Sequence, residues 1–127
     1  MLITTFEEAC EIRGIDPQSF ERGFDFLPEE HQQGFQALAK LTIVIDALNT
    51  DSDGSVWTPD FTADELKYEL WFIMGSPSGA GFSDGDCVGW HSDSYVGSRL
   101  VFRNRETALH AKEHFFDLFK SWMVLNP

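Results

Sequence analysis

The chain has 127 residues, of which 43% are hydrophobic and 14% aromatic, with nine Lys and Arg against 21 Asp and Glu. This length suits one domain with one core, and this composition excludes an intrinsically disordered chain. The net charge of −12 at pH 7 repels phosphate backbones, so we expect no direct binding to duplex nucleic acid. We predict a single folded domain over residues 1–127.

The acidic charge is concentrated in the first half of the chain. Residues 1–65 hold fourteen acids and three bases, whereas residues 66–127 hold seven acids and six bases. The simpler interpretation is that acidity keeps an aromatic-rich domain soluble. The alternative is that the acidic half imitates the charge of a nucleic acid.

The chain start and the cysteine content predict a cytoplasmic protein without a membrane segment. The stretch Met1–Glu8 lacks the cationic and apolar regions of a signal peptide, and no later stretch is long and apolar enough to span a bilayer. In that compartment Cys10 and Cys87 are expected to be reduced and buried.

Two helices are predicted before the middle of the chain. Thr5 and Glu8 have the spacing of a capping box, which predicts a short helix from Thr5 to Arg13 that ends at Gly14. Apolar side chains then recur at steps of three and four residues over Pro28–Leu48, which predicts a long helix.

The second half of the chain predicts a sheet followed by a helix. Alternation over residues 67–74, a segment within 82–91, and the stretch 99–103 predict three strands, and their short connections favour an antiparallel sheet. The apolar stretch 106–125 predicts a final helix that lies across this sheet. The fold class is therefore α+β with two layers: a three-stranded antiparallel sheet covered by two main helices, plus a short N-terminal helix. One core is expected to contain Leu38, Leu41, Leu48, Leu100, Phe102, Phe115, Phe119 and Trp122.

Several short segments carry a resemblance to a known family. They are Trp57–Phe61, Lys67–Phe72, Gly81–Ser83 and Val96–Phe102, followed by a final helix with Ala111, Phe115, Asp117, Phe119 and Lys120. Through them the chain resembles, over about residues 35–125, a family of small uncharacterised proteins carried on phages and mobile elements of gut anaerobic bacteria. Residues 50–56 are an insertion relative to that pattern. The resemblance implies a biological setting and no activity.

The segment that contains this insertion has the spacing of a calcium loop. Oxygen ligands stand at positions 1, 3, 5, 7 and 12 of an EF-hand loop, namely Asn49, Asp51, Asp53, the Ser55 carbonyl and Asp60, with Gly54 at position 6. Asp60 is one methylene shorter than the usual Glu, and Pro59 stiffens the exit. A solvated acidic turn is the commoner explanation, so no cofactor is expected, and a calcium-binding domain is retained as an alternative.

Two further patterns suggest enzymatic chemistry. Cys87 and His91 could form a nucleophile and base pair, but the Gly-rich sequence around them gives no reason for an activated thiol. His110 and His114 match the H-x-x-E-H zinc motif, although a chance pair on the polar side of a helix is the simpler explanation.

A recognition surface is the remaining functional hypothesis. Its candidates are the aromatic residues Trp57, Phe61, Trp71 and Trp90 and the basic residues Arg99 and Arg103. Burial of the aromatics, and pairing of the arginines with the chain's own carboxylates, are the simpler alternatives. We therefore predict a non-enzymatic accessory or regulatory binding protein of phage or mobile-element origin with a protein partner. An enzyme that uses Cys87 and His91 is the rival class.

Overall fold

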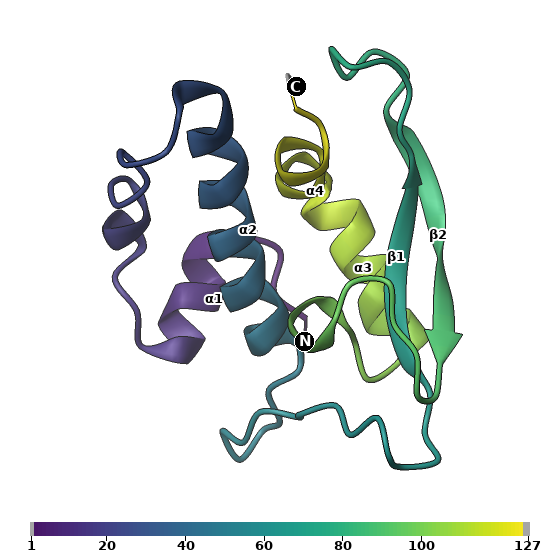
Figure 1. Ribbon diagram of the computed structural model, residues 1–127. Helices are drawn as coiled ribbons and strands as arrows, with labels where there is room; N and C mark the ends of the chain where they lie inside the picture. The colour runs from purple at the N-terminus through teal and green to yellow at the C-terminus, as the bar shows by residue number, and fades with distance from the viewer. Residues whose placement is uncertain (1, 126–127) are drawn as a thin grey trace.

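The computed structural model describes residues 2–125 and arranges them in three layers (Figure 1). The elements in chain order are α1 (Phe6–Arg13), the short 3-10 helix η1 (Pro17–Phe20), α2 (Glu29–Leu48), β1 (Lys67–Ile73), β2 (Ser83–Trp90), the 3-10 helix η2 (Ser98–Leu100), α3 (Arg105–His114) and α4 (Phe116–Met123). α1 packs on α2, α2 packs on α4, and α3 packs on both strands. The α3–α4 pair therefore separates α2 from the sheet, and the predicted arrangement of both main helices on the sheet in two layers is wrong.

The first two helices begin and end where the sequence predicts. The Glu8 N–H donates to Thr5 Oγ1 at 3.2 Å, and the Thr5 N–H donates to Glu8 Oε1 at 3.1 Å, which completes the capping box. Gly14 ends α1 in the left-handed conformation at a φ of 67°. α2 starts directly after Pro28 and ends at Leu48, as predicted.

The two strands form an antiparallel hairpin in which Lys67 lies opposite Trp90 and Leu70 lies opposite Cys87. The register shifts between Trp71 and Ile73. At this irregularity a Cβ on Gly85 would overlap the backbone carbonyl of Trp71, so only glycine fits the position.

In the described part of the chain the sheet contains two strands, not the predicted three. Ser98–Leu100 form η2, and Phe102 makes a single bridge with Tyr68 through N–O distances of 2.9 and 2.7 Å. Gly97, at a φ of 76°, turns the chain before this bridge, and Asn104 caps α3 just after it. The extended segment between these two residues is too short to form a strand.

The final helix is two helices that meet at Phe115, where φ is −124° and ψ is 24°. The apolar pattern over residues 106–125 predicted helix for most of this segment, but not the break at Phe115 or the end at Met123. Because of this break, α3 faces the hairpin while α4 packs against α2. Gly34 permits the close approach of α2 and α4, since a Cβ there would lie 3.2 Å from the Ser121 carbonyl oxygen.

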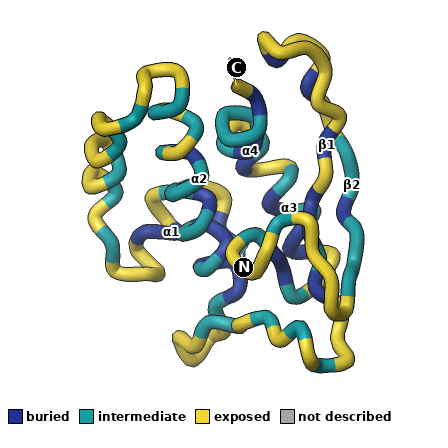
Figure 2. The backbone as a smooth tube through the Cα atoms, in the orientation of Figure 1, coloured by how far each residue is buried: buried dark blue, intermediate teal, exposed yellow. Residues whose placement is uncertain are grey.

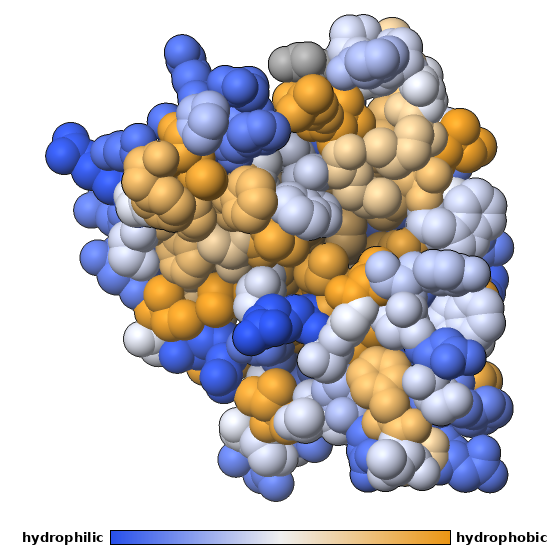
Figure 3. Space-filling model, viewed as in Figure 1, coloured by the Kyte–Doolittle hydropathy of each residue, from blue (hydrophilic) through white to orange (hydrophobic). Residues whose placement is uncertain are grey.

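The core lies between the layers and includes most of the residues predicted for it (Figure 2). Those that are buried are Leu41, Leu48, Phe102, Phe115 and Phe119, and those that are partly buried against them are Leu100 and Trp122. Leu38 is half-buried. On the face seen in Figure 3, hydrophobic side chains gather between the helical layers and the hairpin, and hydrophilic ones cover much of the margin.

Within residues 2–125, no helix has the length and apolar character that crossing a membrane requires. Cys10 and Cys87 are both free and buried.

Candidate interaction surface

The hairpin has an inner face turned toward the helices and an outer face turned away from them. Alternation along β1 directs Leu70 and Phe72 into the core and directs Lys67, Glu69, Trp71 and Ile73 to the outer face. Figure 2 shows the resulting change between buried and exposed residues along β1. The outer face is open at Trp71 and Ile73, which are 49% and 54% exposed.

Lys67 is fully buried on this outer face, although it carries a charge. Its Nζ donates to the carbonyl oxygens of Ala63 at 3.1 Å and His91 at 2.8 Å. It also lies 5.4 Å from the centre of the Phe61 ring, within range of a cation–π contact. Lys67 therefore ties the loop that precedes β1 to the end of β2.

Glu69 is the second buried charge and holds the loop of residues 91–97. Its carboxylate accepts from Ser94 Oγ at 2.7 Å and from the Tyr95 N–H at 3.0 Å. This anchor leaves the Tyr95 side chain 85% exposed, edge-on to the Trp90 ring at a centroid distance of 5.4 Å. The loop thus presents Tyr95 in a defined position.

We call the resulting surface the hairpin face. It consists of aromatic and aliphatic side chains that surround the two buried charges: Phe61, Trp71, Ile73, Trp90 and Tyr95. Breaking the hydrogen bonds of a buried charge is costly, so Lys67 and Glu69 make the loops around this surface rigid.

One end of the hairpin face is rimmed by carboxylates. The loops 57–66 and 91–97 contribute exposed acidic residues and contain no Lys or Arg; the acids are Asp60, Asp64, Glu65 and Asp93. Hydrogen bonds from the Thr62 hydroxyl and N–H lower the pKa of Asp60, so it is ionised at neutral pH. His91 Nε2 lies 3.5 Å from Asp64.

At the other end of the hairpin the acids are paired with bases. Asp84 lies 3.4 Å from Lys112, and Asp86 lies 3.1 Å from Arg105. Among the described residues, the acids of the hairpin that lack a Lys or Arg partner therefore lie on the loop side of the hairpin face.

Three of the aromatic residues predicted for recognition lie on the hairpin face: Phe61, Trp71 and Trp90. Trp57 is half-buried, and its backbone N–H donates to the Asn49 carbonyl at 2.8 Å. Arg99 is exposed on η2. Three of the six residues predicted for recognition therefore lie on the hairpin face.

Arg103 forms an ion pair with Asp51. This is the alternative in which the arginines pair with the chain's own carboxylates. Asn49, the first residue of the proposed calcium loop, is buried; its Nδ2 donates to the Val101 carbonyl at 3.0 Å, and its Oδ1, the proposed ligand atom, accepts from the Arg103 backbone N–H at 3.4 Å. These contacts occupy two of the five proposed calcium ligands.

The other proposed ligands also have local partners. Asp53 accepts from the Ser55 N–H and hydroxyl, and Asp60 accepts from those of Thr62. The Ser55 carbonyl accepts from the Asp51 N–H at 2.7 Å. Over residues 2–125, no three side chains of His, Cys, Asp or Glu are grouped as a metal site would require. A solvated turn should bind calcium no more tightly than about millimolar, whereas a calcium loop should bind it at micromolar concentration.

Cys87 and His91 have separate surroundings. Cys87 faces inward and its Sγ accepts from Arg105 Nη1 at 3.1 Å, while burial raises the pKa of the thiol. His91 is exposed beside Asp64. Four residues along an extended chain span about 13 Å, which is too far for a direct nucleophile–base hydrogen bond.

His110 and His114 stack at a ring distance of 4.3 Å on α3. The Nε2 of His110 lies 2.6 Å from the carbonyl oxygen of Ile3, so this ring nitrogen has a backbone partner. His110 therefore links the N-terminal segment to α3.

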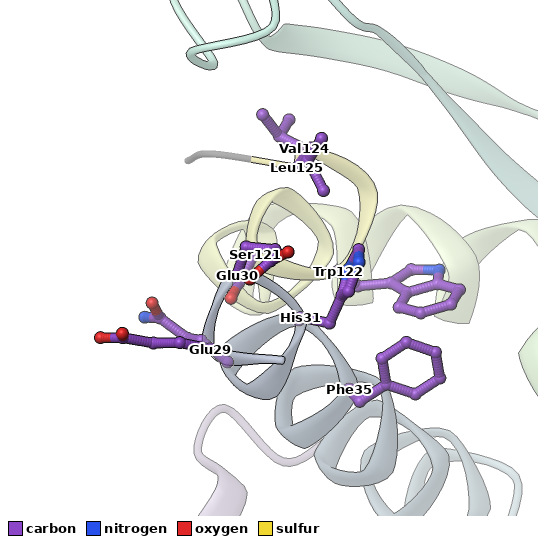
Figure 4. Close-up of a pocket in the computed structure, with 10 residues that line it drawn as sticks. Glu29, Glu30, His31, Phe35, Ser121, Trp122, Val124 and Leu125 are labelled. Atoms are coloured by element: carbon purple, nitrogen blue, oxygen red, sulfur yellow. The ribbon is translucent and has the colours of Figure 1, made fainter. Parts of the chain in front are cut away.

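A hollow of about 320 Å³ lies between the start of α2 and the end of α4 (Figure 4). Phe35 and Trp122 pack edge to face along it at 5.5 Å, and the Glu29 side chain points away from them. In the described part of the chain, the buried Ser121 Oγ has no hydrogen-bond partner. The residues that line this hollow include Glu29, Glu30, His31 and Gln33, together with Phe35 and Trp122. We consider the hairpin face the stronger candidate because its exposed aromatic side chains are accompanied by two buried charges that hold the adjoining loops.

Sequence reasoning did not identify Lys67, Glu69 or Tyr95 as parts of the site. The period of two along β1 already places both charges on the face of Trp71, which could have linked them to the recognition hypothesis. Their burial could not be predicted, because it depends on the loop of residues 91–97, which is distant in sequence and contacts both side chains.

The chain matches no protein-family model, no curated protein and no solved structure.

Proposed function

We propose that this protein is a non-enzymatic accessory or regulatory protein that binds a protein partner through the hairpin face. The observation that supports this most is the exposure of Trp71, Ile73 and Tyr95 on one side of the hairpin. Aromatic side chains are enriched in protein interfaces and often dominate their binding energy.

The rigidity of the surface also favours binding. Lys67 and Glu69 fix the loops that carry Phe61 and Tyr95 through hydrogen bonds of 2.7 to 3.1 Å. A surface that is ordered before binding loses less conformational entropy when the partner arrives. Exposed aromatic groups on a rigid base are therefore a suitable anchor for a partner.

The setting of this function is part of the proposal. The resemblance to proteins of phages and mobile elements suggests that the partner belongs to such an element or its bacterial host. Action in the cytoplasm and the absence of enzymatic activity remain predictions.

The proposal is tested by comparing two surface variants. Trp71→Ser removes the central aromatic of the hairpin face, whereas Phe26→Ser removes a side chain that is 79% exposed in the segment between η1 and α2. Tagged forms of both variants and of the natural chain are used to capture partners from the native host, and the affinity for each purified partner is then measured.

We expect Trp71→Ser to weaken the affinity at least about tenfold, which is the loss of about 1.4 kcal/mol expected of an interface anchor. Phe26→Ser should bind like the natural chain. Equal affinity of all three proteins, or equal loss in both variants, would contradict the proposal. Circular dichroism checks that both variants are folded.

A further inference from the structure

The charge around the hairpin face selects among possible partners. Its loops contribute four exposed carboxylates, while the lysine on this face is buried and fully engaged by two carbonyls and a ring. The chain as a whole carries a net charge of −12. An acidic partner or a nucleic acid would be repelled at this surface, and a purely apolar partner would leave the carboxylates desolvated.

The hairpin face already binds one cationic group of its own. The Lys67 ammonium is held by the carbonyls of Ala63 and His91 and lies against the Phe61 ring. The exposed Trp71 and Tyr95 are aromatic surfaces of the same kind with free area, and Asp64 and Asp93 are exposed carboxylates on the loops at the same face. Aromatic faces attract Lys and Arg, and ionised carboxylates on the rim add to this attraction.

From these observations we infer that the hairpin face binds a cationic segment of a protein, a stretch rich in Arg or Lys whose side chains stack on Trp71 and Tyr95 and pair with Asp64 and Asp93. This inference rests on the proposed function and specifies the chemistry of its partner. Arg suits the site best, because its planar group stacks on an aromatic ring while it donates to a carboxylate.

The probe is a short peptide of alternating Arg and Gly, with a matched peptide in which Gln replaces each Arg. Each is added to the isotope-labelled full chain at about 0.15 M salt, and backbone and indole signals are followed by NMR. We expect the Arg peptide to shift the signals of Trp71, Trp90 and Tyr95, and the Gln peptide to leave them unchanged. Shifts spread evenly over the acidic residues of α1 and α2 would overturn the inference, since they would indicate unspecific attraction to a negative protein.

Two charge variants localise the attraction. Asp64→Asn with Asp93→Asn removes two carboxylates of the rim, and Glu7→Gln with Glu11→Gln removes two exposed carboxylates of α1. We expect the first pair to weaken peptide binding about fivefold and the second pair to have little effect. Equal weakening by both pairs would overturn the inference.

The outcomes for the natural partner separate the two proposals. If Trp71→Ser abolishes binding of a captured partner, while neither salt nor the Asp64 and Asp93 changes affect it, the proposed function stands and the cationic partner is wrong. If the captured partner binds the Trp71 variant normally, the proposed function fails, whatever the peptides do.

Discussion

Lys67 and Glu69 lie two residues apart on the outer face of β1, and the two buried side chains form hydrogen bonds with different loop residues. Lys67 donates to Ala63 and His91, and Glu69 accepts from Ser94 and Tyr95. About 7 Å of strand separates two such residues, so their side chains act at separate points along the surface. The order of the hairpin face therefore depends on two ionic groups, Lys67 and Glu69.

Replacing Lys67 with Met is expected to destabilise the fold by about 2–4 kcal/mol. The change leaves the Ala63 and His91 carbonyls without the ammonium donor that joins them. Urea unfolding followed by circular dichroism measures the loss. Glu65→Gln, an exposed carboxylate two residues before Lys67, is the control and should change stability by less than about 0.5 kcal/mol. Equal stability of both variants would show that Lys67 does not hold the loops.

Gly85→Ala is expected to destabilise the hairpin by about 2–4 kcal/mol, because the new methyl group would overlap the Trp71 carbonyl. The strands would have to separate at the shift in register, so Trp71 fluorescence and partner binding should change with stability. Ser83→Ala, at an exposed position of the same strand, is the control. A Gly85→Ala protein with natural stability would mean that the strands can separate there without cost.

Alkylation of Cys87 by iodoacetamide at pH 7.5 is expected to be slower than that of free cysteine. Burial raises the pKa of this thiol above its ordinary value of 9.0, so less of the reactive thiolate is present at neutral pH. The rate should rise as the pH passes 9. Mass spectrometry of the peptides separates Cys87 from Cys10, whose thiol pKa is also raised, mainly by burial.

Arg105→Gln tests the cause of this behaviour. The Arg105 charge opposes the effect of burial, so its removal should raise the thiol pKa further and slow alkylation, provided that the fold is kept. Because the folded chain keeps the thiol proton when the unfolded chain has lost it, stability should also fall as the pH rises past the unfolded-state pKa. Rapid alkylation of Cys87 in the folded protein at pH 7.5 would instead support an activated nucleophile.

Calorimetric titration with calcium is expected to give no binding tighter than about millimolar at the loop of residues 49–60. Arg103 already neutralises Asp51, and Asn49 is engaged by the backbone of Val101 and Arg103. A metal would have to displace these contacts before it gained its own. Micromolar binding that disappears in Asp51→Ala would contradict this prediction and support the calcium loop.

Local sequence signals predicted the elements that local interactions form. The capping box of Thr5 and Glu8 and the stop at Gly14 act within a few residues, so the start and end of α1 follow from the sequence. The apolar period over α2 and the alternation along β1 likewise reflect which side of each element is buried. The sequence by itself also determined the strongly negative net charge.

The tertiary structure alone decided the features that depend on distant segments. The break at Phe115 lets two helices face different neighbours, and the bridge of Phe102 stays single because a turn and a helix cap enclose it. From the sequence, Lys67 and Glu69 are expected to be exposed strand residues, but the distant loop of residues 91–97 contacts both of them in the folded chain. Such contacts join residues 24 to 54 positions apart, as those of Lys67 with His91 and of Asn49 with Arg103 do. Periodicity reports which side of an element is buried, but not which distant segment buries it, because that depends on how all the layers pack together.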